Sequence, residues 1–99
     1  MKPFAERLRE DRRLVLLRLL AEQNGYRSNS SILHAALYGL GVAASRDDVL
    51  TDLAWLHDQS LVALDEAVPG VHVATLSARG HDVVLGQTRV PGVSRPSPR

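Results

Sequence analysis

The sequence predicts one mainly α-helical domain with a small β-hairpin, in the order α-α-α-β-β-α, over residues 1–86. The chain of 99 residues is 44% hydrophobic and 23% charged, which is typical of a single globular domain. Leucine-rich segments with helical spacing extend from the N-terminus to about residue 58. Two β-prone runs separated by a Pro-Gly turn follow them, and together these features predict the fold class.

A long first helix is expected over about residues 3–24. No glycine or proline lies inside this segment, and Gly25 stands where the residue after a helix end is often left-handed. The apolar residues between Leu14 and Leu20 spread around most of the helix circumference, so the helix has to be covered on two sides. We expect the domain core on one side and a second copy of the helix on the other. Burial by later parts of the same chain, with Phe4 and Leu8 left as an exposed patch, is the alternative. The expected dimer interface consists of Phe4, Leu8, Leu16 and Leu19.

Two shorter helices are expected next. The polar linker of residues 26–31 is rich in residues that cap helices, and apolar residues with helical spacing follow it up to Gly39. The third helix has the clearest start signal, because Ser45 and Asp48 match the S-x-x-[DE] capping box. Its inner stripe is predicted to be Val49, Leu53 and Leu56.

The pattern then changes from helical to β period. The runs 61–64 and 71–76 flank a segment that contains Pro69 and Gly70, which predicts a β-hairpin with a Pro-Gly turn. Ser77 is expected to cap a final short helix over residues 78–85.

Residues 87–99 carry three prolines and no core periodicity. They contain no acidic residue and three arginines, so the sequence predicts an extended or disordered basic tail. The arginines are Arg89, Arg95 and Arg99.

This order of elements is that of a winged helix-turn-helix domain. Residues 45–62 resemble the part of such regulators in which a recognition helix leads through "leucine, x, glycine, leucine, valine" into the wing, with Ser60 at the glycine position. Residues 74–80 resemble the segment in which the second wing strand enters the last helix. The whole chain, including residues 79–83 and 91–96, resembles a family of small proteins of Mu-like phages and prophages that are often described as arsenic-repressor-like regulators. The resemblance implies a DNA-binding transcriptional regulator in the bacterial host cell.

The charge distribution disagrees with this implication in one respect. In a winged helix the third helix enters the major groove and the wing contacts the backbone, so both should carry cations or amides. Here the third helix offers Arg46 beside four aspartates, and the predicted wing offers Asp65 and Glu66 without a cation. Carboxylates at these places repel phosphates.

Contacts with double-stranded DNA are therefore expected mainly at the start of the second helix, where backbone N–H groups and the helix dipole favour anions. Arg46 is the candidate for base recognition. The basic tail, and Arg12 and Arg13 if they face outward, would add contacts. Each of these residues has an alternative role as an ordinary cap or a solvated side chain. The predicted nucleic-acid-binding residues are Arg27, Ser28, Asn29, Ser30, Arg46 and Thr51.

The competing hypothesis is a protein-protein adaptor that presents its acidic third helix and wing to a basic partner. Trp55 would be its anchor, because tryptophan is enriched at interface hot spots, and Asp52 and Asp58 would supply the charge. The alternative for Trp55 is a lid that packs on the hairpin.

Catalysis and cofactors are not expected. The sequence has no cysteine and no metalloprotease, nucleophile-elbow or P-loop motif. The pairs His57-Asp58 and His81-Asp82 cannot each chelate alone, because neighbouring residues of a helix diverge by about 100°, so no metal site is predicted outside a dimer interface.

The apolar runs of the sequence are too short for a signal peptide or a membrane span, which predicts a cytoplasmic protein.

Overall fold

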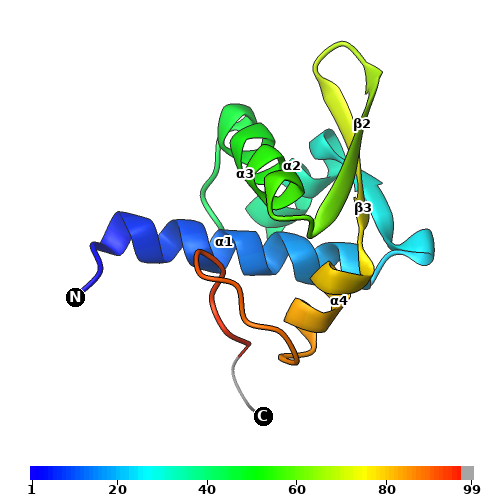
Figure 1. Ribbon diagram of the computed structural model, residues 1–99. Helices are drawn as coiled ribbons and strands as arrows, with labels where there is room; N and C mark the ends of the chain where they lie inside the picture. The colour runs from blue at the N-terminus through cyan, green and yellow to red at the C-terminus, as the bar shows by residue number, and fades with distance from the viewer. Residues whose placement is uncertain (97–99) are drawn as a thin grey trace.

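The computed structural model describes residues 1–96 and combines four α-helices with one antiparallel sheet (Figure 1). The predicted Arg99 of the basic tail lies outside the described residues. A 3-10 turn, Asn24–Tyr26, follows the first helix. The helices are α1 (Phe4–Ala21), α2 (Ser30–Gly39), α3 (Arg46–Asp58) and α4 (Ala78–Val84). The strands are β1 (Arg27–Asn29), β2 (Val62–Val68) and β3 (Val71–Leu76).

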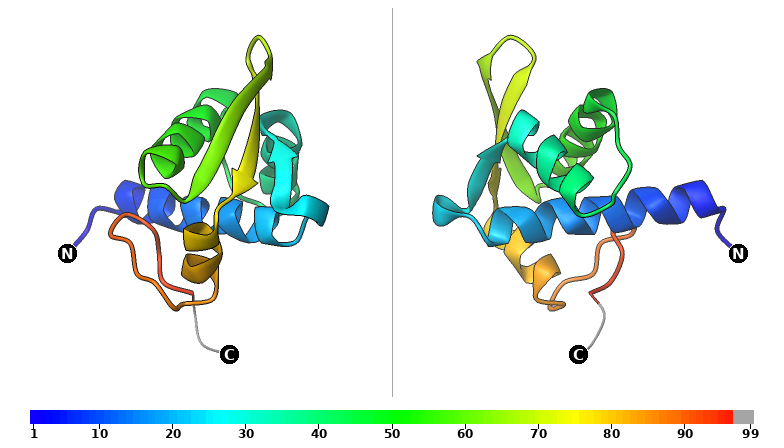
Figure 2. Two further views of the ribbon diagram at one scale, coloured as in Figure 1. Left: turned by 45° about the vertical axis from the view of Figure 1, so that its right-hand side comes forward. Right: turned by 180° about the vertical axis from the view of Figure 1, so that it is seen from behind.

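Helix α1 passes through the middle of the domain. Helices α2 and α3 lie on one side of it, and α4 and residues 87–96 lie on the other (Figures 1 and 2). Its residues Leu14, Leu16, Leu17 and Leu20 are all buried in the core. The leucines spread around the helix because other parts of this chain cover α1 on several sides. Leu16 is 0% exposed, so the prediction that it lies in a dimer interface is wrong.

Both predicted short helices are confirmed, together with their caps. Asn29 caps α2 by accepting a hydrogen bond from the backbone N–H of Ile32 at 2.8 Å. Ser45 Oγ accepts from the N–H of Asp48, and Asp48 Oδ2 accepts from the N–H of Ser45, both at 2.9 Å. This capping box fixes where α3 begins. The expected inner stripe of α3 is fully buried and consists of Val49, Leu53 and Leu56.

The hairpin is confirmed, and the sheet has a third strand that the sequence did not predict. β2 pairs with β3 from Val62 opposite Leu76 to Val68 opposite Val71. β1 pairs with the other edge of β3, which gives the order β1-β3-β2. The residues of β1 are polar, and the last of them, Asn29, caps α2, so their local pattern indicates a linker. Only pairing with a distant strand makes them a β-strand.

Residues 87–96, which we call the C-terminal strap, fold back along α1 (Figure 1). Val90 and Val93 are buried, and the N–H of Ser94 donates to the carbonyl of Glu10 at 3.2 Å. The sequence predicted an extended or disordered tail, and over residues 87–96 the chain instead forms turns that dock on α1. Two valines three residues apart anchor the strap, and such a short apolar pattern is too weak to predict docking from sequence.

The capping box leads to a pH-dependent expectation for stability. Its hydrogen bond from the backbone of Ser45 lowers the pKa of Asp48 below its ordinary value of 3.8. The folded state thus favours the ionised carboxylate of Asp48. The resulting gain in folding stability is fully present when the pH is above the ordinary pKa, and it is lost as the pH falls through the lowered pKa of the folded state.

We expect Ser45→Ala to lower the free energy of unfolding by about 1 kcal/mol at neutral pH, measured by urea denaturation. The stability advantage of the wild type over Asp48→Asn should shrink as the pH falls below 3.8. Asp47→Asn is the matched control, because Asp47 is exposed and lies outside the capping box. An equal pH dependence for both variants would contradict the assignment.

Candidate interaction surface

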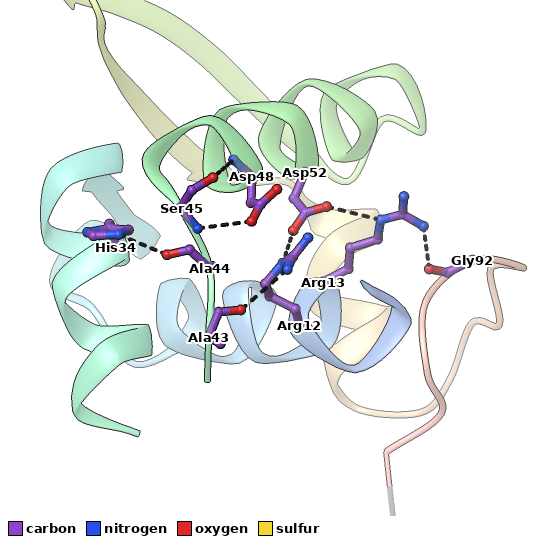
Figure 3. A network of polar contacts seen from close by, with 9 residues as sticks. All are labelled: Arg12, Arg13, His34, Ala43, Ala44, Ser45, Asp48, Asp52 and Gly92. Atoms are coloured by element: carbon purple, nitrogen blue, oxygen red, sulfur yellow. Dashed lines mark hydrogen bonds and ion pairs between the residues drawn. The ribbon is translucent and has the colours of Figure 1, made fainter. Parts of the chain in front are cut away.

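A buried carboxylate joins α1 to α3. Asp52 is 1% exposed, and its Oδ2 accepts a hydrogen bond from Nε of Arg12 at 2.5 Å (Figure 3). Its Oδ1 lies 3.5 Å from Nε of Arg13. Arg12 also donates to the carbonyl of Ala43 at 3.5 Å, in the loop before α3. Asp52 was expected to bind a partner, and this is wrong because its charge is neutralised inside the protein. Arg12 and Arg13 face inward for the same reason.

Trp55 is half-buried between α1 and the C-terminal strap. The guanidinium carbon of Arg13 lies 4.0 Å from the centre of the Trp55 ring, a cation-π contact. Arg13 Nη1 also donates to the carbonyl of Gly92 at 3.0 Å (Figure 3). A Cβ atom on Gly92 would lie 2.5 Å from the ring, so the strap backbone packs directly on Trp55. Trp55 is thus covered by the strap and by Arg13, so it is not a free anchor for a partner.

The exposed charges that remain on α3 and β2 are mostly negative. Arg46 is the one Lys or Arg residue between residues 46 and 76. Asp47 and Asp58 lie eleven positions apart on α3, which places them on one outer face with Thr51 and Ala54 between them. We call the exposed carboxylates of the two elements the acidic surface; they are Asp47, Asp48, Asp58, Asp65 and Glu66.

The predicted nucleic-acid-binding residues differ in exposure and fall into three groups. Arg27, Arg46 and Thr51 are exposed. Ser28 and Asn29 are half-buried in β1 and pair with β3. The remaining residue, Ser30, is 6% exposed, and its Oγ accepts from the N–H of His72 at 3.1 Å, so it holds α2 to the hairpin and its assignment as a DNA contact is wrong.

A second surface lies along α1. Phe4 is 75% exposed and Leu8 is 49% exposed, whereas Val15 and Leu19 on the same face are partly buried. A groove of about 340 Å³ borders this face, between Leu8 and Val15 of α1 and the loop of residues 41–43. We call Phe4, Leu8, Val15 and Leu19 the outer stripe of α1. Val15 takes the position on this face for which Leu16 was expected.

Within residues 1–96, no cluster of three or more His, Cys, Asp or Glu side chains has the arrangement of a metal site. In the same part of the chain, no helix combines the length and apolar character needed to cross a bilayer.

These features define a small mixed α/β protein whose candidate functional sites are exposed surfaces. The chain belongs to the family of gp26 of Escherichia phage Mu, a protein described as uncharacterized. It is 48% identical to gp26 over 92 residues, which cover 93% of this chain and 94% of gp26. An uncharacterized protein of Haemophilus influenzae is 41% identical over 76 residues, 77% of this chain and 74% of that relative. The resemblance to proteins of Mu-like phages is thus confirmed. No family model matches the chain, and no solved structure does.

The buried ion pairs should dominate the stability of the α1–α3 contact. We expect Asp52→Ala to lower the free energy of unfolding by about 3–5 kcal/mol, because it leaves two largely buried guanidinium groups without their carboxylate. Urea denaturation followed by circular dichroism measures the change. Asp58→Ala on the exposed face of the same helix is the control and should change stability by about 0.5 kcal/mol or less. Similar losses in both variants would contradict the role of Asp52.

Gly92 should be required for the strap to pack on Trp55. We expect Gly92→Ala to displace the strap, because the new Cβ meets two ring carbons of Trp55 at 2.5 and 2.7 Å. Trp55 is the sole tryptophan, so displacement should shift the intrinsic fluorescence to longer wavelength and increase quenching by acrylamide. Gly39→Ala is the control, since a Cβ there meets no atom within 4 Å. Unchanged emission of Gly92→Ala would refute the contact.

Proposed function

We propose that this protein of Mu-like phages is a winged-helix adaptor, which binds a basic segment of a protein partner through its acidic surface. The order of three helices, a hairpin and a last helix supports the winged-helix assignment. In this assignment α3 occupies the place of the recognition helix, and β2 and β3 form the wing. We further propose that the adaptor has no enzymatic activity and acts as a homodimer in the cytoplasm of the host cell.

The observation that carries the proposal is the sign of the exposed charge on α3 and β2. Five exposed carboxylates stand there against Arg46 alone. Nearby, Asp52, Arg12 and Arg13 are largely buried in contacts with one another, and the exposed Arg79 of α4 donates a hydrogen bond to the carbonyl of Gln59 at the end of α3. A surface of this sign repels DNA phosphates and attracts a cationic protein segment.

The spacing of the aspartates on α3 also limits how far apart the basic groups of the partner can be. Asp47 and Asp58 stand about 16 Å apart along the helix axis, from a rise of 1.5 Å per residue. Thr51 and Ala54 lie between them and are small, so a partner backbone can approach the helix closely. An extended segment that reaches both aspartates needs basic groups separated by about five residues.

DNA binding by a transcriptional regulator is the second candidate function, and the surroundings of Arg46 favour it. Arg46 Nη1 lies 3.5 Å from Ser31 Oγ, beside a cavity of about 30 Å³ between α2, α3 and the hairpin tip. Arg46 and Arg27 are exposed and could contact phosphates, as could Arg89 and Arg95 of the strap. Asp47 follows Arg46 directly and opposes such a contact, so we rank this function second.

Site-specific photocrosslinking tests the adaptor. A benzoylphenylalanine at Ala54 stands in the centre of the acidic face, and one at the exposed Ala35 of α2 is the control position. In host cells that propagate the phage, we expect an adduct with a basic protein at position 54 and none at position 35. The combined substitutions Asp47→Asn and Asp58→Asn should reduce the yield at least tenfold. An adduct that is insensitive to these substitutions, or no adduct, would contradict the proposal.

A gel-shift assay with duplex fragments of the phage genome at low salt distinguishes the adaptor from a DNA-binding regulator. The adaptor should leave the duplexes unshifted. A salt-dependent shift that Arg46→Ala weakens would instead support the DNA-binding regulator.

A further inference from the structure

The outer stripe of α1 has the properties of an interaction surface. Phe4 and Leu8 are large apolar side chains with 75% and 49% exposure near the start of α1, and the N-terminal end of this helix extends beyond the other elements (Figure 1). The groove of about 340 Å³ borders Leu8, and Tyr38, which is 83% exposed, lines an adjoining hollow that shares the loop of residues 41–43. Exposed apolar residues that gather at a groove, rather than standing singly, indicate a binding site.

The spacing along the stripe indicates which partner fits. Its four residues are arranged symmetrically about the midpoint between Asp11 and Arg12. Phe4 and Leu19 are equally far from this midpoint, and so are Leu8 and Val15. A second α1 that runs antiparallel, with a two-fold axis at the midpoint, therefore meets the stripe in register.

We propose that the outer stripe is the interface for a second copy of this chain, with the two α1 helices antiparallel about that axis. This inference rests on the homodimer included in the proposed function and assigns its interface. Phe4 lies opposite Leu19 of the second copy, and Leu8 lies opposite Val15 of the second copy. Each protruding side chain thus meets a partly buried one next to the groove, which is a self-complementary, isologous contact.

The charges at the centre of the stripe are compatible with this arrangement. Asp11 stands level with Arg12 of the second copy, and Arg12 lines the groove beside the stripe. Arg12 is already bonded to Asp52, and Asp11 accepts a hydrogen bond from Ser94 Oγ, so these two central charges keep partners within their own chain.

A parallel pair of α1 helices fits less well. It would place Arg7, Asp11 and Arg18 beside their own copies, which brings like charges together at each level. It would also stack Phe4 on Phe4 at one end of the pair and Leu19 on Leu19 at the other. The structure thus favours the antiparallel pair.

Cysteine cross-linking tests the register, because the chain contains no cysteine of its own. We expect an oxidised mixture of the Leu8→Cys and Val15→Cys variants to form the mixed disulfide at least tenfold more than either variant forms a disulfide with itself. Preferential self-linking of Leu8→Cys would overturn the antiparallel arrangement, since it is the product of a parallel pair.

Light scattering distinguishes whether the protein is a homodimer at all from whether the outer stripe is its interface. The wild type should have twice the chain mass of 10.8 kDa at micromolar concentration, and Leu8→Glu should have the mass of one folded chain. Leu85→Glu is the control, because Leu85 is exposed at the end of α4, away from the stripe. A monomeric wild type would overturn both the homodimer and this interface. A dimer that persists in Leu8→Glu would keep the homodimer and overturn only the interface.

Discussion

The carboxylate of Asp52, held between Arg12 and Arg13, is the interaction on which the arrangement of this protein depends. A buried carboxylate is costly unless cations compensate it, and two guanidinium groups from adjacent positions of α1 do so: Arg12 donates a hydrogen bond to Asp52, and Arg13 lies at ion-pair distance. Each arginine then extends the link. Arg12 reaches the loop before α3, and Arg13 contacts both Trp55 and the strap. One ionic centre therefore fixes how α1, α3 and the strap lie relative to one another.

Local signals predicted most of the elements, because capping and turn geometry depend on neighbouring residues. The capping box of Ser45 placed the start of α3, and Pro69 and Gly70 placed the hairpin turn. The parts that were missed depend on distant contacts. β1 is a strand only because β3 lies beside it, and the strap docks because Val90 and Val93 enter the core and Glu10 and Arg13 of α1 hold its backbone. A pattern read along the chain contains no information about such partners.

The errors in the candidate site have a similar origin. A charged residue beside an apolar stripe is normally solvated, so Asp52 was expected on the surface, yet its partners come from 40 positions earlier in the chain. Leu16 and Val15 are neighbours in an apolar run that surrounds the helix, and hydrophobicity alone cannot tell which of them faces outward. The exposed positions of Phe4, Leu8 and Asp58 agree with their expected roles, because each lies where the rest of the domain leaves the helix uncovered.

The acidic surface and the outer stripe of α1 make different contributions to one proposed activity. Exposed ion pairs each contribute about 0–1 kcal/mol and are screened by salt, so the carboxylates of one copy attract a basic segment only weakly. Two copies related by a two-fold axis present two acidic surfaces at a fixed separation. A partner with two basic segments at that separation binds the second surface as an intramolecular step, which raises its overall affinity without any new contact. In the proposed dimer the apolar stripe supplies the assembly energy, and the carboxylates supply the choice of partner.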